Sequence, residues 1–247
     1  MSIVVCDVPD PADWIRKSWV KGSVVEAVPG GFEAYARVLH PAGFEDRAGL
    51  RPVTWGAVAT LHGHEVHADS RWDDIAEPAV TAESSGASIW NRKPVEGSLS
   101  PETAGVLGRV LANHTTTPVI VWLCAWDGWA GLRWVTPGRE VGLLATGRRR
   151  ERVWWGDSPK TERIPLPTVQ LLGREYVLLR GSIADVGQSV VEPPGWQLTN
   201  LWWPDDRSWF VSTPIDGRST FVGGSEACIE ALIRTESVEA LAVQTST

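Results

Sequence analysis

Hydrophobic residues recur at helical spacing in four places along the chain, each time directly after a residue that favours the first position of a helix. Such a residue accepts a hydrogen bond from a backbone N–H that the helix leaves unpaired, and so marks where the helix begins. The predicted helices begin after Asp10, carrying Trp14, Ile15 and Trp19; after Thr54, through Leu61; after Ser100, to about Asn113; and after Ser225, to about Ile233.

Short apolar or alternating runs between turn residues predict strands, most of them in the second half of the chain. The run from Val119 to Trp126 is almost wholly apolar, which is typical of a central strand covered on both faces. Residues 62–99 are polar and weakly periodic, so we expect a loop there with a short helix near Asp73–Ile75. The expected strands are 32–39, 119–126, 152–155, 169–172, 176–180, 209–213, 219–222 and 238–243.

These elements predict an α+β fold. Helices dominate the first half, strands dominate the second, and no segment repeats at a fixed period. The length of 247 residues fits one large domain. We therefore predict a single domain over residues 1–243, with a mixed, mostly antiparallel sheet, a few packed helices and a strand-rich second half. Residues 244–247 are expected to be a frayed tail.

Composition adds an excess of tryptophan and an acidic balance. The chain has 15 Trp against 4 Phe and 2 Tyr, and nine of the Trp fall in 122–134, 154–155 and 202–209. The net charge of −7 argues against a nucleic-acid binder and against an electrostatic membrane anchor, but it is compatible with a basic protein partner. The longest apolar run, Val119–Ala125, is too short to cross a membrane.

The start of the chain and the cysteines indicate the compartment. The first residues carry no basic stretch followed by a long apolar run, so they do not resemble a signal peptide. Cys6, Cys124 and Cys228 are far apart and odd in number, which is typical of reduced thiols. We therefore predict a cytoplasmic protein.

The segment 202–209 is the densest group of tryptophans and charges. Three indoles flank an acid-rich turn that carries one arginine, and indole faces bind cations and sugars while Trp and Arg are favoured in binding hot spots. In the alternative interpretation the indoles pack inward and the charged residues form a solvated turn. The candidate partner-binding residues here are Trp202, Trp203, Asp205, Asp206, Arg207 and Trp209.

A second aromatic segment lies at the end of the predicted central strand. Trp122, Cys124 and Trp126 share one face of that strand, and Asp127-Gly128 is a strong turn signal. Packing in the core explains most of this segment. If the strand end opens into a cleft, Trp126, Asp127 and Trp129 would form its rim.

Three of the five histidines lie in His62-Gly63-His64-Glu65-Val66-His67. This spacing resembles the HxHxDH run of metallo-β-lactamase-type hydrolases, but Val66 stands where that motif supplies a ligand to the second metal. Neutral imidazoles together with Asp69 would suit zinc. A solvated, histidine-rich loop is the alternative interpretation.

Four stretches together resemble a family of uncharacterised proteins from actinobacterial, high-GC Gram-positive genomes. The stretches are Phe32–Pro41 (FEAYARVLHP), Glu96–Leu99 (EGSL), Asn200–Trp209 (NLWWPDDRSW) and Ser219–Ser225 (STFVGGS). The resemblance implies a bacterial cytoplasmic protein and carries no known activity. The histidine cluster is not among the marks of that family.

No motif in the sequence identifies a nucleophile, so the leading prediction is a non-enzymatic binding protein of the toxin-neutralising or regulatory type. It would hold a protein partner on the Trp- and Asp-rich surface, and the acidic charge favours a basic one. One alternative is a small-ligand or carbohydrate pocket lined by tryptophan. The other is a zinc-dependent hydrolase using His62, His64, His67 and Asp69. No cofactor is expected apart from that zinc, and the oligomeric state stays open.

Overall fold

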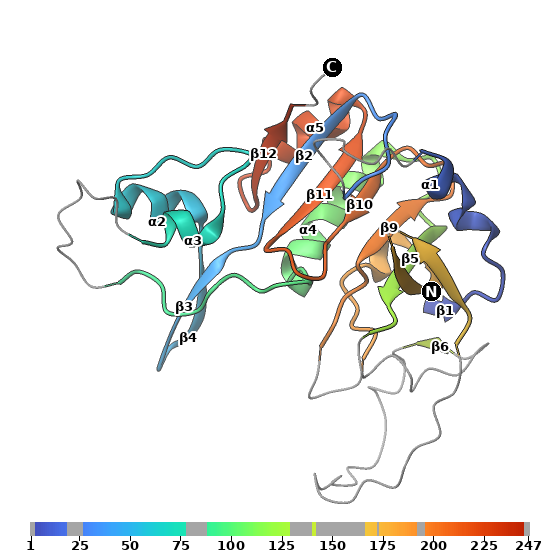
Figure 1. Cartoon of the computed structure of the whole chain (residues 1–247), viewed down its shortest axis with the longest axis horizontal. Helices are drawn as coiled ribbons and strands as arrows, with labels where there is room; N and C mark the ends of the chain where they lie inside the picture. Colours follow the sequence, from blue (N-terminus) through green and yellow to red (C-terminus); the bar gives the residue numbers. More distant parts are fainter. Residues whose placement is uncertain are drawn as a thin grey trace, which may run out of the picture.

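The computed structural model describes residues 3–18, 27–77, 88–128, 140–141, 166–171, 173–191 and 196–244 (Figure 1). Thr54, Ser100 and Ser225 each cap a helix, accepting hydrogen bonds from the backbone N–H groups of Ala57, Thr103 and Cys228. The predicted helix starts at these three residues are confirmed. The helices are α1 (Asp13–Ser18), α2 (Trp55–His62), α3 (Trp72–Ile75), α4 (Pro101–Leu111) and α5 (Glu226–Ile233), with 3-10 turns at Asp10–Ala12, Ala112–His114 and Ile183–Asp185.

Ten strands of the described chain form one sheet, in the order β12-β2-β11-β10-β9-β5-β8-β1-β6, with β7 paired to β8. Every pairing described is antiparallel, and β3 and β4 form a separate hairpin. The strands are β1 (Ile3–Val5), β2 (Ala34–Leu39), β3 (Ala42–Asp46), β4 (Gly49–Val53), β5 (Val121–Trp126), β6 (Glu140–Val141), β7 (Thr168–Leu171), β8 (Arg174–Gly181), β9 (Leu201–Pro204), β10 (Phe210–Ser212), β11 (Ser219–Gly224) and β12 (Glu239–Val243). The predicted α+β fold with a strand-rich second half is confirmed.

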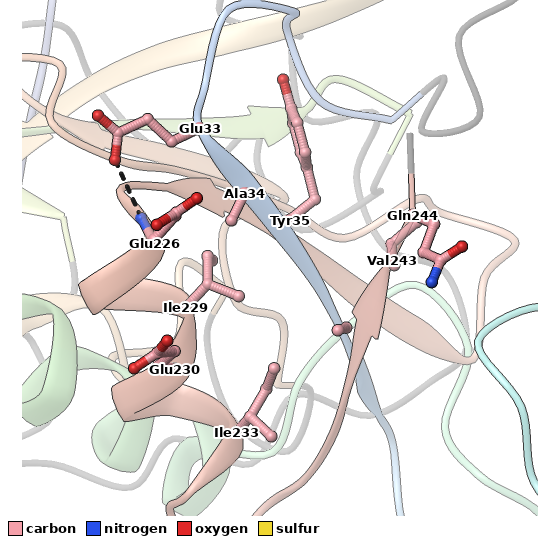
Figure 2. Close-up of a pocket in the computed structure, with 10 residues that line it drawn as sticks. Glu33, Ala34, Tyr35, Glu226, Ile229, Glu230, Ile233, Val243 and Gln244 are labelled. Atoms are coloured by element: carbon pink, nitrogen blue, oxygen red, sulfur yellow. Dashed lines mark hydrogen bonds between the residues drawn. The ribbon is translucent and has the colours of Figure 1, made fainter. Parts of the chain in front are cut away.

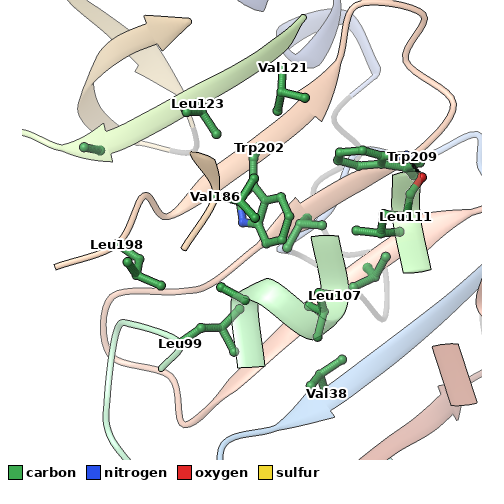
Figure 3. Packing of buried hydrophobic residues seen from close by; sticks show 14 of the residues in the cluster. Val38, Leu99, Leu107, Leu111, Val121, Leu123, Val186, Leu198, Trp202 and Trp209 are labelled. Carbon is green, nitrogen blue, oxygen red and sulfur yellow. Dashed lines mark hydrogen bonds between the residues drawn. The ribbon is translucent and has the colours of Figure 1, made fainter. Parts of the chain in front are cut away.

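The core has three parts that follow from this arrangement. On one face of the sheet lie α4 and α5 (Figure 1). α4 buries Leu107 and Leu111 against the strands (Figure 3), and α5 buries Ile229 there. On the opposite face, α1 packs against a cluster that includes Trp203. The third part lies around α2 and α3 beside the sheet, where Trp55 is buried.

The central strand β5 shows how the sequence pattern produces this layering. Val121, Leu123 and Ala125 face the α4 and α5 side, whereas Trp122 and Trp126 belong with Cys124 to the opposite cluster. β5 lies between β9 and β8, so its backbone is paired on both sides. The predicted central strand and the shared face of Trp122, Cys124 and Trp126 are confirmed.

Several strands were not expected from the sequence. β1 has three residues, β9 is buried on both faces and shows no alternation, and much of the β3–β4 hairpin is exposed, so none of them carries a period-two signal. Their pairing with distant strands defines them instead. The predicted strand 152–155 and the tail residues 245–247 lie outside the described residues.

Candidate functional site

The three indoles of segment 202–209 are buried. Trp202, Trp203 and Trp209 are 1%, 0% and 0% exposed. Trp202 and Trp209 meet edge to face on the α4 and α5 side, and Trp203 stacks on Phe210 on the opposite side. An exposed patch of these indoles is therefore contradicted, because β9 and β10 are interior strands whose two faces are both covered. The alternative, with the indoles inward and a solvated charged turn, is confirmed.

The charged turn between β9 and β10 is exposed but engaged within the molecule. The carboxylate of Asp205 accepts a hydrogen bond from the indole N–H of Trp122 at 2.9 Å. Arg207 has a left-handed backbone with φ of 57°, and its guanidinium lies 5.6 Å from the ring centroid of Trp14. These contacts attach the turn to the face of the sheet that carries α1.

Asp206 fastens the same turn to the loop that follows α4. Its carboxylate accepts hydrogen bonds from the backbone N–H of Thr116 at 2.6 Å and from the hydroxyls of Thr115 and Ser208 at 2.9 and 2.8 Å. Partial desolvation acts to raise the pKa of Asp206, but the hydrogen bonds from Thr116 and Ser208 together outweigh it and lower the pKa to about 2. The geometry gives this carboxylate a structural role.

We expect Asp206→Asn to lower the free energy of unfolding, because the neutral amide loses the charge that strengthens these hydrogen bonds. The loss should be only roughly 1 kcal/mol, since solvent screens the charge of an exposed carboxylate. The folded pKa is below the ordinary value of 3.8, so the stabilisation is present above that value and is lost as the pH falls toward 2. Urea unfolding at pH 7 and at pH 3 measures both effects. Asp205→Asn is the matched control, and an equal loss in the two variants would contradict the role given to Asp206.

The described residues of the second aromatic segment are engaged within the molecule. The ring of Trp126 is half-buried and lies over Gly128, where a Cβ atom would collide with it. The backbone N–H of Trp126 donates to the side chain of Asn200, and that of Asp127 donates to the carbonyl of Glu175. Trp129 lies outside the described residues.

The histidines of the loop after α2 do not converge. One ring nitrogen of His62 lies 3.0 Å from the carbonyl oxygen of Ile75, and one of His64 lies 2.8 Å from that of Glu77. His67 lies 3.8 Å from the carboxylate of Glu65. In the part of the chain that the structure describes, no three His, Cys, Asp or Glu side chains could share a metal ion. The alternative of a zinc site at His62, His64, His67 and Asp69 therefore has no ligand set there.

A groove of about 580 Å³ lies between α5 and the strands β2 and β12 (Figure 2). We call it the acidic groove. Its lining includes three carboxylates and an apolar floor from both the helix and the strands. The lining residues are Glu33, Ala34, Tyr35, Glu226, Ile229, Glu230, Ile233, Ala242, Val243 and Gln244.

The charged side chains that line the acidic groove are all carboxylates. Glu33 accepts a hydrogen bond from the backbone N–H of Glu226 at 3.1 Å, where a negative charge also favours the start of α5 (Figure 2). The carboxylate of Glu226 has no hydrogen-bond or ion-pair partner among the described residues. The carboxylate of Glu230 lies 3.3 Å from the guanidinium of Arg234, but both side chains are largely exposed, so this ion pair is weak. No residue that lines the groove is a cation.

Sequence reasoning missed the acidic groove because its parts are far apart along the chain. Glu33 lies just before β2, and only the antiparallel pairing of β2 with β11 brings it beside the start of α5. One signal was visible in the sequence: Glu226 and Glu230 are four residues apart, so they lie on one face of a helix.

The stretches 32–41, 96–99, 200–209 and 219–225 contribute to a buried network of hydrogen bonds. The ring of His40 lies 2.9 Å from the hydroxyl of Thr220, which lies 2.7 Å from that of Thr213. The side chain of Asn200 donates to the carbonyl of Gly97 at 3.0 Å. These stretches therefore hold the loop before α4 against the sheet, which is a role in the fold.

Comparison with protein-family models, with curated proteins and with solved structures finds no match to this chain. None of the described helices combines the length and the apolar run that crossing a membrane requires.

Proposed function

We propose that this protein is a non-enzymatic binding protein, of the toxin-neutralising or regulatory type, whose partner is a basic protein segment held in the acidic groove. One observation carries the proposal: three carboxylates stand over an apolar floor, and no lining residue offers a positive charge. A basic segment complements both features, since its cations would face the carboxylates and the methylene stems of its lysines would cover the floor. The three cysteines are thiols, which supports the cytoplasm as the compartment.

The lining of the groove favours this function over a tryptophan-lined pocket for a small ligand. Its one aromatic lining residue is Tyr35. Of the predicted tryptophans that the structure describes, Trp202, Trp203 and Trp209 are buried and Trp126 lies over Gly128. A carbohydrate site normally needs an exposed ring face with a few convergent polar groups. The groove instead offers aliphatic side chains from Ile229 and Ile233 beside the carboxylates.

The proposal predicts that a short synthetic peptide of alternating lysine and valine binds the protein, with an affinity that falls as salt is raised. The double variant Glu226→Gln/Glu230→Gln is expected to weaken binding roughly three- to tenfold, because each exposed charge pair contributes a fraction of a kcal/mol to about 1 kcal/mol. Isothermal titration calorimetry at low and at physiological salt measures both effects.

The matched control is Glu65→Gln/Glu175→Gln, which makes the same change of net charge at exposed carboxylates in the loop after α2 and on β8, neither of which lines the groove. It is expected to keep nearly the full affinity. Equal weakening in the two double variants would show that only the overall charge of the protein matters, and it would overturn the acidic groove as the binding site.

A further inference from the structure

The strand β12 forms one edge of the sheet, because β2 is its only partner among the described strands. Edge strands are usually guarded by lysine, proline, a bulge or a covering element, since their free backbone groups can pair with another chain. The sequence of β12 is Glu-Ala-Leu-Ala-Val, which holds neither lysine nor proline. The outward-facing backbone N–H and C=O groups of β12 can therefore pair with an added strand.

The single charge of β12 does not guard the edge. The two carboxylate oxygens of Glu239 accept hydrogen bonds from the backbone N–H groups of Trp55 and Gly56, at 2.6 and 2.7 Å. The side chain is thus held at the start of α2, where it offsets unpaired donors and the helix dipole. The second half of β12 carries no charged side chain.

That second half is continuous with the acidic groove. Ala242 is exposed and lines the groove. Val243 and Gln244 line it as well (Figure 2). Ala240 belongs to the cluster under α5. Because side chains alternate along a strand, Ala242 faces the same side of the sheet. A strand added along this edge would therefore present every second side chain on the same side as Glu226 and Glu230.

We propose that the partner binds by strand addition: an extended basic segment pairs its main chain with the free edge of β12. Alternate cationic side chains then point toward the carboxylates of the acidic groove. This inference rests on the proposed function and specifies how the partner is held. Main-chain hydrogen bonds would supply affinity and the alternating side chains would supply selectivity, as in other complexes formed by strand addition.

Charge complementarity favours a basic partner over a second copy of the chain. Pairing of two β12 edges would bring two acidic grooves toward each other, and each copy carries a net charge of −7. Like charges brought together at an interface oppose association. The segment that complements the edge and the groove at once is an extended chain with positive side chains at every second position.

The test compares three synthetic peptides on the full-length protein: alternating lysine and valine, the same sequence with alternate backbone nitrogens methylated, and the same composition arranged in two blocks. The alternating peptide is expected to slow exchange of the outward-facing amides of β12 about tenfold, as followed by NMR hydrogen exchange. Methylation removes main-chain donors, so affinity is expected to fall roughly tenfold. The block peptide is expected to bind weakly.

The outcomes separate strand addition from the proposed function. Equal binding of all three peptides, weakened each time by Glu226→Gln/Glu230→Gln and without protection of β12, would overturn strand addition and retain the acidic groove. Protection of β12 that is insensitive to the two substitutions would support strand addition and overturn the groove. No binding would overturn both. Protection that grows with protein concentration in the absence of peptide would identify a second copy and overturn the basic partner.

Discussion

Replacement of Trp209 by alanine is expected to lower the free energy of unfolding by about 3–5 kcal/mol. The side chain is 0% exposed and meets Trp202 edge to face, with ring centroids 6.0 Å apart. Its indole N–H donates to the carbonyl oxygen of Leu111 at 3.0 Å, which gives one of the last carbonyls of α4 a partner (Figure 3). Truncation would therefore leave both a cavity between sheet and helix and a buried acceptor without a donor. Urea denaturation followed by circular dichroism measures the change.

Two further variants separate these effects for Trp209. Trp209→Phe keeps a ring but removes the donor to Leu111, so we expect a smaller loss that includes about 1–3 kcal/mol for the unpaired carbonyl. Trp196→Ala makes the same truncation at a side chain that is 42% exposed, and it should change stability by less than about 0.5 kcal/mol. Similar losses at positions 196 and 209 would contradict the burial that the structure assigns to Trp209.

The helices could be predicted from the sequence because their starts are local. The hydroxyls of Thr54, Ser100 and Ser225 each bond a backbone N–H three residues later, so the decisive contact lies within one short segment. Strands have no such local mark. β9 takes its structure from β5 and β10, and its partner residues in β5 lie some 80 positions earlier in the chain. Its four buried residues carry no alternation that sequence reasoning could detect.

The candidate site illustrates the same limit. The density of tryptophans in 202–209 predicts a binding surface, yet the elements packed on the two faces of the sheet bury these side chains in the core. The acidic groove was not expected because Glu33 and Glu226 meet only after strand pairing. The density of tryptophans along the sequence therefore indicated core residues. The carboxylates of the acidic groove, in contrast, come together only in the folded structure.

Acidification is expected to destabilise the protein through His40. The ring is 2% exposed, and it lies 2.7 Å from the carbonyl oxygen of Val95 and 2.9 Å from the hydroxyl of Thr220. Burial lowers the pKa of His40, the hydrogen bond to Val95 opposes that change, and the nearby charge of Arg37 lowers the pKa further, to about 4. The native state therefore holds the ring neutral in the buried network that joins the loop before α4 to the sheet.

The sign of the effect follows from the two states of His40. Above its ordinary pKa of 6.5 neither state binds the proton, so stability does not change with this group. Between that value and about 4 the unfolded chain binds a proton that the folded protein excludes, so stability declines as the pH falls. The difference between the two pKa values of His40 corresponds to a loss of roughly 3 kcal/mol in the free energy of unfolding. Urea unfolding from pH 7.5 to 4, in half-unit steps, measures this decline.

The substitution His40→Gln separates this contribution from that of the carboxylates, which also titrate in acid. We expect the variant to be less stable than the wild type at neutral pH, because glutamine fits the network less well. The difference in the free energy of unfolding between the variant and the wild type should then shrink by about 3 kcal/mol toward pH 4, since the variant has no imidazole ring to protonate. His67→Gln, at an exposed imidazole, should keep the wild-type decline. A gap between His40→Gln and wild type that stays constant over the whole range would show that the folded protein accepts the proton on His40, and that the network around Val95 and Thr220 opens without cost.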